Sequence, residues 1–304
     1  MHKASRSAVR FSLHLLLPLA SSVGYVAGVL LLKRSAAFGV GVWRTTFIAN
    51  LCLAICVAPF WLLGGAGGGI FWQPLVTASL FFIGQVATFI AIDRGDVSVA
   101  TPVLGAKIIL VALISALLLP DPTPLKWWIA AALSTAAIIL LNRRPSGTAT
   151  SIQNRNIGAT IIAALAAALA FAICDVLVQK WAPGWGVGHF LPIMFGTVGL
   201  LSFGLIPFFS ASVRQIERPA WPWLIGGSVL LGLQAAAVGI AIGAFGDATA
   251  VNIVYSSRGL WSVLAVWWIG HWFYNDEQKL GPAVLRLRLW GAGLMLLAIA
   301  LVLV

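Results

Sequence analysis

The sequence predicts an all-α integral membrane protein, with ten transmembrane helices arranged as two inverted repeats of five helices each. Three observations lead to this fold class: a very apolar composition, ten apolar runs long enough to span a membrane, and a match between the two halves of the chain. Of the 304 residues, 61% are hydrophobic and 9% are charged, whereas about 25% are charged in an average soluble domain. Because about 20 apolar residues span the hydrocarbon core, the chain is long enough for about ten spans.

The charged residues give the chain a formal net charge of +11, from 19 Lys and Arg against 8 Asp and Glu. These cations lie near the ends of apolar runs, where they reach toward lipid headgroups and set topology. They form no basic stripe interleaved with aromatic residues, so we expect membrane lipids as partners and no nucleic acid. The three cysteines lie inside apolar runs, which gives no disulfide framework and no metal site.

Ten apolar runs follow one another along the chain and are separated by turn signals. The first run is not a signal peptide, because it continues for about 22 residues to Lys33, beyond the core of a signal peptide, which is about 7–15 residues long. Later breaks combine glycine, proline and charged residues, as at 64–69, 93–96 and 120–124. The predicted spans are 11–32, 42–63, 73–92, 97–119, 125–141, 157–180, 190–209, 222–243, 248–272 and 284–304.

A polar stretch near the middle of the chain separates five runs from the other five. It is rich in Ser, Thr, Asn and Arg and reads as a flexible linker. We therefore expect residues 1–145 to form the first five-helix repeat, residues 146–156 to form the linker, and residues 157–304 to form the second repeat.

The two halves of the chain match at a slowly drifting offset, which is the sequence sign of an internal repeat. The matches pair basic with basic residues, and glutamine with glutamine, inside runs that contain few polar residues. Because five is an odd number of spans, the second copy enters the membrane from the opposite side, and an axis in the membrane plane relates the copies. The matched positions are 33–41 with 180–188 (offset 147), Gln85 with Gln234 (offset 149) and Lys107 with Arg258 (offset 151).

Two short motifs in the fourth predicted helix add to the evidence of the two five-helix units. The helix opens with Gly-Asp-Val-Ser-Val-Ala-Thr at 95–101 and closes with Ala-Leu-Leu-Leu-Pro-Asp at 116–121. With these features, nearly the whole chain resembles the ten-helix EamA-like branch of the drug/metabolite transporter (DMT) superfamily. The resemblance implies a substrate pathway lined by helices one, three, four, six, eight and nine. Two positions depart from the family pattern: Ile108 lies about where a proline is usual, and Asp121 replaces a glutamate.

Two basic residues lie deep inside apolar runs. Lys107 is about ten residues into a run of about 23, which places it near the bilayer centre, and Arg258 is equally deep in the ninth run. Each costs about 2.5–3.5 kcal/mol on an insertion scale, so both should face the helix bundle or a wet cavity. We predict that they hold an anionic group of a substrate, a use of cations similar to that in the superfamily's organic-phosphate exchangers. The alternative is a structural network in which Asp175 or backbone carbonyls neutralise them.

Polar residues near these cations are further candidates for substrate binding. Tyr255 and Ser262 share the helical face of Arg258, and Asn252 lies one turn before Tyr255. Gln85 and Gln234 occupy matched places on helices three and eight, where contacts between helices explain them as well as a ligand does. Tyr25 belongs to a polar stripe with Ser21 and Gly28 on the first helix, for which close helix packing is the favoured interpretation.

Asp175 is the candidate for ion coupling. It lies inside the sixth run, about five residues from the predicted end of that run at residue 180. A carboxylate inside a membrane span is a common proton relay. Its shallow predicted position favours the alternative, in which Asp175 is a counter-ion or an acid at the membrane interface.

The sequence lacks the motifs of several competing classes of protein. The glycine-rich segment 64–69 is followed by no Lys-Ser/Thr, so it is no nucleotide-binding loop, and neither a His-Glu-x-x-His nor a Gly-x-Ser-x-Gly motif is present. We therefore expect no enzyme, no ATP-driven transport and no cofactor. The predicted function is a secondary-active transporter, a permease or exporter that moves a small polar metabolite with an anionic group by alternating access.

Two other functions fit the same bundle of helices, namely a lipid-carrier flippase and a non-transporting membrane subunit. A flippase would open sideways to lipid, whereas a transporter would have a water-filled pathway. In each case we expect a multi-pass protein of the cell (inner) membrane, present as a monomer or a homodimer.

Overall fold

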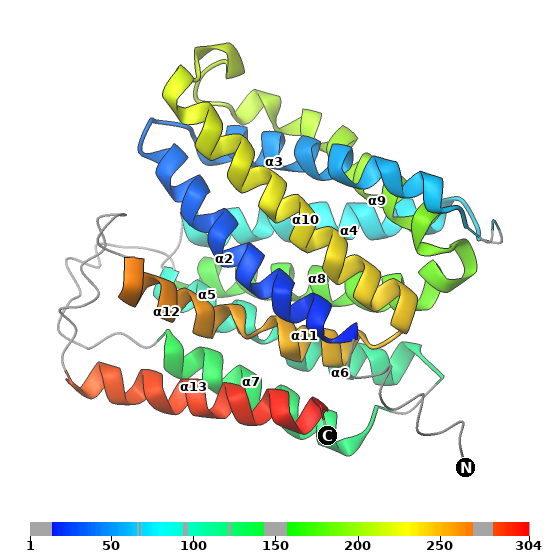
Figure 1. Cartoon of the computed structure of the whole chain (residues 1–304), viewed down its shortest axis with the longest axis vertical. Coiled ribbons are helices and arrows are strands. Elements are labelled where there is room, and N and C mark those ends of the chain that lie inside the picture. The colour runs from blue at the N-terminus through cyan, green and yellow to red at the C-terminus, as the bar shows by residue number, and fades with distance from the viewer. Residues whose placement is uncertain are drawn as a thin grey trace. The chain divides into compact units, whose positions relative to one another are not determined.

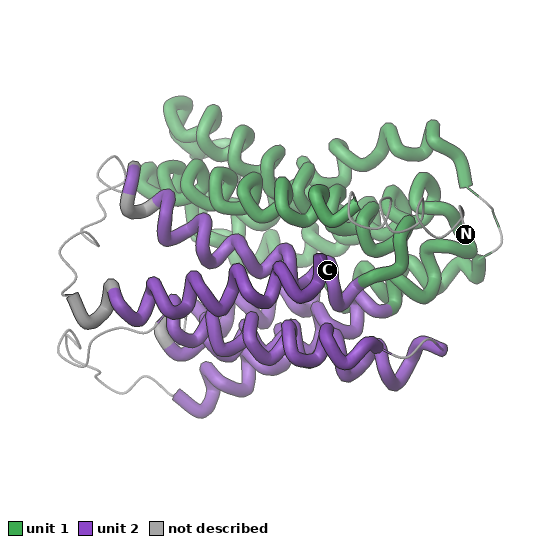
Figure 2. The backbone as a smooth tube through the Cα atoms, turned by 60° about the horizontal axis from the view of Figure 1, so that its bottom comes forward, with its two compact units in different colours: residues 1–82, 177–247 green, residues 83–176, 248–304 purple. Residues whose placement is uncertain are grey.

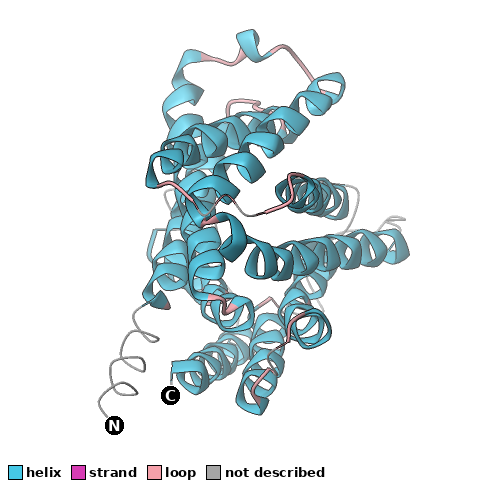
Figure 3. Cartoon of the chain, turned by 90° about the vertical axis from the view of Figure 1, so that its right-hand side faces the viewer, coloured by secondary structure: helices cyan, strands magenta, loops and turns pink. Residues whose placement is uncertain are grey.

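The computed structural model describes residues 14–65, 67, 69–93, 97–120, 123–142, 157–269 and 282–303. All regular structure in these ranges is helical (Figures 1 and 3). Within them, eight helices are long and apolar enough to cross a membrane. The prediction of an all-α protein with membrane-spanning helices is therefore confirmed at this level. The predicted linker at 146–156 lies outside the described residues.

The first half of the chain forms helices that follow the predicted apolar runs. The first helix continues to Ala36, four residues beyond the predicted end of its run. The elements are α2 (Leu16–Ala36), α3 (Val42–Val57), η1 (Ala58–Leu63), α4 (Trp72–Asp93), α5 (Val97–Gly105), α6 (Lys107–Leu118) and α7 (Leu125–Leu141).

The second half also follows its runs, with one run divided and another extended. The ninth run forms two short helices, and the sixth continues to Trp185 instead of ending at 180. The elements are α8 (Ile157–Trp185), α9 (Val187–Leu201), η2 (Ser202–Phe208), η3 (Val213–Gln215), η4 (Arg218–Ala220), α10 (Trp221–Phe245), α11 (Ala248–Tyr255), α12 (Arg258–Ile269) and α13 (Pro282–Leu303).

Two of the predicted spans are not among the eight long helices. The fifth, α7, has 17 residues, which is at the lower limit for crossing the hydrocarbon core. The ninth is divided between α11, with 8 residues, and α12, with 12 residues.

The helices group into two compact units (Figure 2). Unit 1 comprises Met1–Phe82 and Leu177–Asp247, and unit 2 comprises Ile83–Val176 and Ala248–Val304. Helices α4 and α8 each contribute residues to both units. Each unit therefore draws on both halves of the sequence, so these groups of packed helices are distinct from the two predicted sequence repeats.

In unit 1, small residues let α2 and α10 lie against each other. A Cβ atom on Gly28 would lie 3.1 Å from the carbonyl oxygen of Gly227, and one on Gly227 would lie 2.9 Å from the carbonyl oxygen of Gly28. Helix α3 packs on both α9 and α10, and a Cβ on Gly232 of α10 would lie 3.1 Å from the backbone of Leu53. Such close backbone approach by small residues is typical of helix packing in membranes.

In unit 2, α7 lies alongside α13 (Figure 1). Ala137, Leu141 and Met295 form a buried cluster between them. A Cβ on Gly291 of α13 would lie 2.9 Å from the side chain of Leu141, so the two helices meet closely at this glycine. Helix α6 packs on α7, and α11 packs on α6, α7 and α13.

Two runs of unit 2 contain a local break in the α-helical hydrogen bonding at matched positions, although α5 and α6 together still form one of the eight long helices, Val99–Leu118. Between α5 and α6, the N–H of Ala106 donates to the carbonyl of Val103 at 3.0 Å, a three-residue step in place of an α-helical one. Between α11 and α12, the N–H of Ser257 donates to the carbonyl of Val254 at 3.1 Å in the same way. Ala106 and Ser257 are 151 positions apart, the offset that pairs Lys107 with Arg258. The helix that follows each break has 12 residues.

Two matched glycines also share an unusual backbone conformation. Gly39, after α2, has φ of 71°, and Gly186, after α8, has φ of 73°. A positive φ is readily adopted by glycine and strained for most other residues. The two glycines are 147 positions apart, as the sequence match requires.

The ends of α2 and α10 meet at a buried pair in unit 1. The Nε2 atom of His14 lies 3.5 Å from Oδ2 of Asp247, and these side chains are 1% and 13% exposed. The His14 ring also stacks on Phe245 with ring centroids 4.6 Å apart. Burial raises the pKa of the Asp247 carboxyl from its ordinary 3.8 to about 6.

This raised pKa predicts a pH-dependent gain in stability for Asp247→Asn. The folded protein binds the Asp247 proton more tightly than the unfolded chain does, so its stability falls as pH rises from about 4 to about 6. We expect Asp247→Asn to melt at a higher temperature than the wild type at pH 7 and at the same temperature at pH 4. Glu217→Gln, at an exposed site of unit 1, is the control and should change neither. A lower melting temperature for Asp247→Asn at pH 7 would mean that pairing with His14 outweighs the cost of burial.

Candidate functional site

Asp175 on α8 is the centre of a largely buried polar cluster in unit 2. Its Oδ2 atom lies 2.7 Å from Nζ of Lys107 on α6 and accepts a hydrogen bond of 2.7 Å from Nδ2 of Asn252 on α11. The side chains of Lys107 and Asp175 are 19% and 13% exposed, and Asn252 is 3% exposed. We call these three residues the Asp175 cluster. Its short distances are typical of charge-assisted hydrogen bonds.

The position of Asp175 in its helix differs from the prediction. Because α8 continues to Trp185, Asp175 is ten residues from the end of the helix, or about 15 Å along its axis. The predicted end of the run at residue 180 is therefore wrong, and Asp175 lies farther from the helix end than expected. The helix continues through Trp181 and Pro183, although Lys180 is charged and a proline inside a helix is unfavourable.

Lys107 is held from two sides. Its ammonium group faces the Asp175 carboxylate and also lies 5.6 Å from the centroid of the Phe171 ring, a cation–π distance. Phe171 is one turn before Asp175 on α8, so one helical face supplies both partners. A Cβ on Gly84 of α4 would lie 3.0 Å from the Phe171 ring, which shows that α4 meets α8 at this ring.

Arg258 and Tyr255 form a second pair, and Tyr255 is one helical turn after Asn252 of the Asp175 cluster. The Nη1 atom of Arg258 donates to the Tyr255 hydroxyl at 3.3 Å, and its guanidinium carbon lies 4.7 Å from the Tyr255 ring centroid. Tyr255 and Asn252 are three residues apart on α11, all eight residues of which are buried, and residues at this spacing are neighbours on a helix. The structure therefore gathers five of the predicted site residues: Lys107, Asp175, Asn252, Tyr255 and Arg258.

The other four predicted residues are placed differently. Ser262 is exposed on α12, four residues after Arg258 in the same helix, and the break at Ser256–Ser257 separates both of them from Tyr255. Gln85 is half-buried on α4 in unit 2, next to Gly84. Tyr25 and Gln234 belong to unit 1, where the Gln234 side-chain amide donates to the carbonyl of Leu231 in its own helix at 3.0 Å.

Two polar features of the fold were missed by the sequence analysis. Thr249 and Ser115, both buried, join α11 to α6 through a hydroxyl contact of 3.5 Å. Arg44, only 5% exposed, donates to the carbonyl of Gly39 at 2.7 Å and reaches Ser210 and Ser212 of the segment after η2 at 3.4 Å. Its position after a glycine turn, at the start of an apolar run, is the signal that could have marked it as a buried brace.

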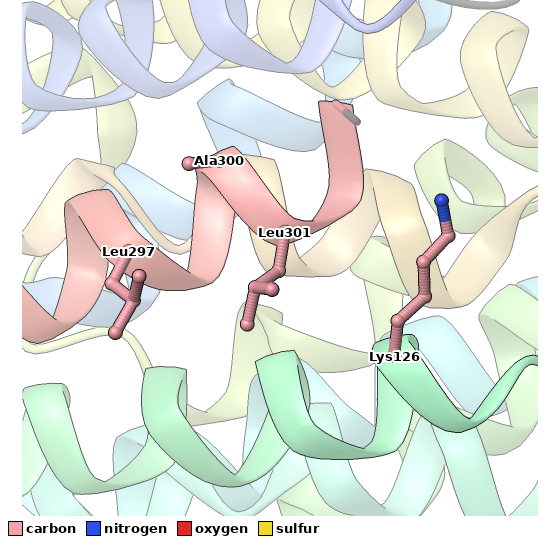
Figure 4. A pocket seen from close by; sticks show the side chains of 4 residues that line it. All are labelled: Lys126, Leu297, Ala300 and Leu301. Atoms are coloured by element: carbon pink, nitrogen blue, oxygen red, sulfur yellow. The ribbon is translucent and has the colours of Figure 1, made fainter.

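One surface groove of about 340 Å³ lies between α7 and α13 (Figure 4). It is lined by Lys126 of α7 and by Leu297, Ala300 and Leu301 of α13, and none of the predicted site residues borders it. Among the described residues, no three His, Cys, Asp or Glu side chains gather as a metal site would require.

Comparison with solved structures identifies the fold. Twenty-nine solved chains match this one. A crystal structure with 15% sequence identity superposes over 96% of this chain and 97% of its own, with a TM-score of 0.72. The fold is a known one. At this identity the likeness concerns the fold alone, and the name of that structure states no function. No family model and no curated protein matches the chain.

The geometry of the Asp175 cluster predicts the outcome of a double substitution. Lys107→Met leaves the Asp175 carboxylate buried without its cation, a change that costs about 3–5 kcal/mol in comparable pairs. The double variant Lys107→Met/Asp175→Leu removes both charges and should melt well above the single variant. Lys126→Met, at an exposed lysine, is the control and should melt like the wild type. The ion pair is unimportant for stability if Lys107→Met alone is as stable as the wild type in thermal melting.

Proposed function

We propose that the protein is a secondary-active transporter that moves a small polar metabolite with an anionic group by alternating access. The observation that carries this proposal is the pair of breaks between α5 and α6 and between α11 and α12, each followed at once by a basic residue. Interrupted helices at corresponding positions of two repeats are the best pointer to a transporter's substrate site. Lys107 and Arg258, the first residues after the breaks, are the residues we propose for binding the anion.

The proposal includes ten spans in two inverted repeats, in the manner of the EamA-like drug/metabolite transporters. Three pairs of packed helices support it, because each joins a span to its counterpart in the other copy: α3 with α9, α7 with α13, and α6 of the fourth span with α11 of the ninth span. Elements near a two-fold axis contact their own counterparts in this way. The matched breaks and the matched positive φ of Gly39 and Gly186 give further support.

The charges of the site favour an anionic substrate. Lys107, Asp175 and Arg258 together carry two positive charges and one negative charge, in an apolar helix bundle. Charged residues inside membrane helices commonly mark substrate pathways, so two cations near one another favour a ligand with a negative charge. Asn252 and Tyr255 would add hydrogen bonds to the polar part of the same ligand.

Arg258→Gln is expected to weaken substrate binding by about 30-fold or more, since loss of one partner of a buried charge pair costs about 2–5 kcal/mol. A thermal-shift screen of anionic and neutral metabolites on the purified protein would find the ligand, and uptake into proteoliposomes would show its transport. Arg218→Gln, at an exposed arginine of unit 1, is the matched control and should bind like the wild type. Unchanged affinity in Arg258→Gln, with the protein folded, would rule out an anion site at this residue.

The inverted repeat predicts that matched loops open on opposite sides of the membrane. Lys33 and Lys180 are exposed and 147 positions apart, each near the end of a helix. In a background with Cys52, Cys56 and Cys174 replaced by alanine, Lys33→Cys and Lys180→Cys should react with a membrane-impermeant maleimide from opposite sides of sealed vesicles. Reaction of both from the same side would contradict the inverted arrangement and leave the two copies parallel.

A further inference from the structure

Lys107 is paired with the negatively charged carboxylate of Asp175. The anionic group of the proposed substrate would pair with the same lysine. One oxygen, Oδ2, receives both the Lys107 ammonium and the Asn252 amide at 2.7 Å. The two donors come from different helices, α6 and α11, and each lies within six residues of a helix break. These donors are therefore already arranged around a carboxylate oxygen with good hydrogen-bond lengths.

Asn252 is oriented by a contact that does not depend on Asp175. Its Nδ2 atom also donates to the carbonyl of Ala248, in its own helix, at 2.9 Å. Its amide N–H groups are therefore directed by α11, which is buried along its whole length. The amide therefore stays directed at Asp175 whether or not Lys107 remains paired with that carboxylate.

A substrate anion at Lys107 would compete with Asp175 for the same ammonium group. If it won, Asp175 would keep Asn252, a neutral donor, and lose its cation. An ionised carboxylate without a cation is unstable in a poorly solvated site, and it becomes neutral by binding a proton. Nearest in sequence to the cluster are three further charged or titratable groups, Cys174 beside Asp175 on α8, Tyr255 on α11 and Arg258 on α12. The same and the packed helices also carry Lys180 on α8, Asp93 on α4, Lys126 on α7, and Arg286 and Arg288 on α13.

The first copy of the repeat has no carboxylate at the corresponding place. The residue 147 positions before Asp175 is Gly28, which is a contact between α2 and α10. The ion pair thus joins a cation of the first copy, Lys107, to an acid of the second copy, Asp175, and the repeat provides no equivalent acid in the first copy. This asymmetry makes a single acid, and so a single proton, the expected partner of each substrate.

We propose that the substrate is a small carboxylate that displaces Asp175 from Lys107, and that Asp175 then takes up one proton from solution. The inference rests on the proposed function and specifies its substrate class and its coupling. Charge balances in this step: the site gains one anion and one proton, the ion pair Lys107–Asp175 is replaced by an ion pair between Lys107 and the substrate, and Asp175 becomes a neutral acid. The loaded and empty sites carry the same net charge, so movement of the loaded site across the membrane transfers no net charge.

The linkage between proton and anion gives a quantitative signature. When one proton is taken up with each anion, affinity strengthens about tenfold for each unit that the pH falls. Between pH 6 and 8 a simple carboxylate stays ionised, because its ordinary pKa is near 4, so the ligand itself contributes no pH dependence. Asp175→Asn retains an amide near Asn252 and cannot take up the proton, which should make carboxylate affinity independent of pH.

The test is isothermal titration calorimetry on the purified full-length protein with acetate, lactate and benzoate as probes. Inorganic phosphate and neutral lactamide serve as comparators. Titration in buffers of different ionisation enthalpy yields the number of protons taken up per anion. We expect about one proton for each carboxylate in the wild type, no proton in Asp175→Asn, and no binding of lactamide. Asp247→Asn, a carboxyl of unit 1, is the matched control and should retain uptake of one proton.

A second variant separates a loss of function from a loss of folding. Lys107→Met/Asp175→Leu keeps no buried charge in the cluster and should fold, as judged by its melting temperature, yet bind none of the carboxylates. Retained carboxylate binding by this folded variant would overturn the inference.

Two other outcomes would overturn the inference and leave the proposed function intact. Carboxylates that bind without proton uptake would mean that Asp175 stays on Lys107 as a structural counter-ion. Binding of inorganic phosphate alone, lost in Arg258→Gln, would mean that the anion site exists but does not select carboxylates. Failure of the proposed function itself has a different result, in which Arg258→Gln changes no affinity for any ligand of the screen.

Discussion

The ion pair between Lys107 and Asp175 is the contact on which the polar interior of unit 2 depends. Each charge alone would be expensive among apolar helices, and together they join α6 to α8 at 2.7 Å. Asn252 joins α11 to the same oxygen, so three helices meet at one carboxylate. The Phe171 ring of α8 lies beside the ammonium group of Lys107. Because Gly84 has no side chain, α4 can pack against this ring.

Small residues decide where helices can meet in both units. Gly28 and Gly227 bring α2 and α10 into backbone contact in unit 1, and Gly291 brings α13 onto Leu141 of α7 in unit 2. At the first helix break, a Cβ on Gly105 would lie 2.8 Å from Ile138 of α7. Helix α7 therefore packs tightly against this break. Packing by small residues, which carry little apolar area, is what membrane helices use when lipid offers no hydrophobic driving force.

Hydropathy predicted where the helices lie because the membrane imposes one length and one polarity on every span. It could not predict the break at Ala106, since apolar residues continue on both sides of it. The same limit applies to Tyr255, which the break at Ser256–Ser257 separates from Arg258 and Ser262 on the next helix. Depth within an apolar run marked Lys107 and Arg258 as candidate site residues. For Asp175 the sequence left two roles open, a proton relay or a counter-ion. The partner of each charged side chain depends on how the helices pack, and the pattern of apolar and polar residues along the sequence does not contain that information.

The two breaks change the hydrogen bonding of the backbone more than its electric field. The positive end of α6 directly follows the negative end of α5, and α12 follows α11 in the same way, so the helix dipoles largely cancel at each break. The N–H groups there are also bonded within the chain, since Ala106 donates to the carbonyl of Val103 and Gly259 donates to the carbonyl of Ser256. Any attraction for an anion at these places thus comes from the side chains of Lys107 and Arg258, and it would be lost if both were made neutral.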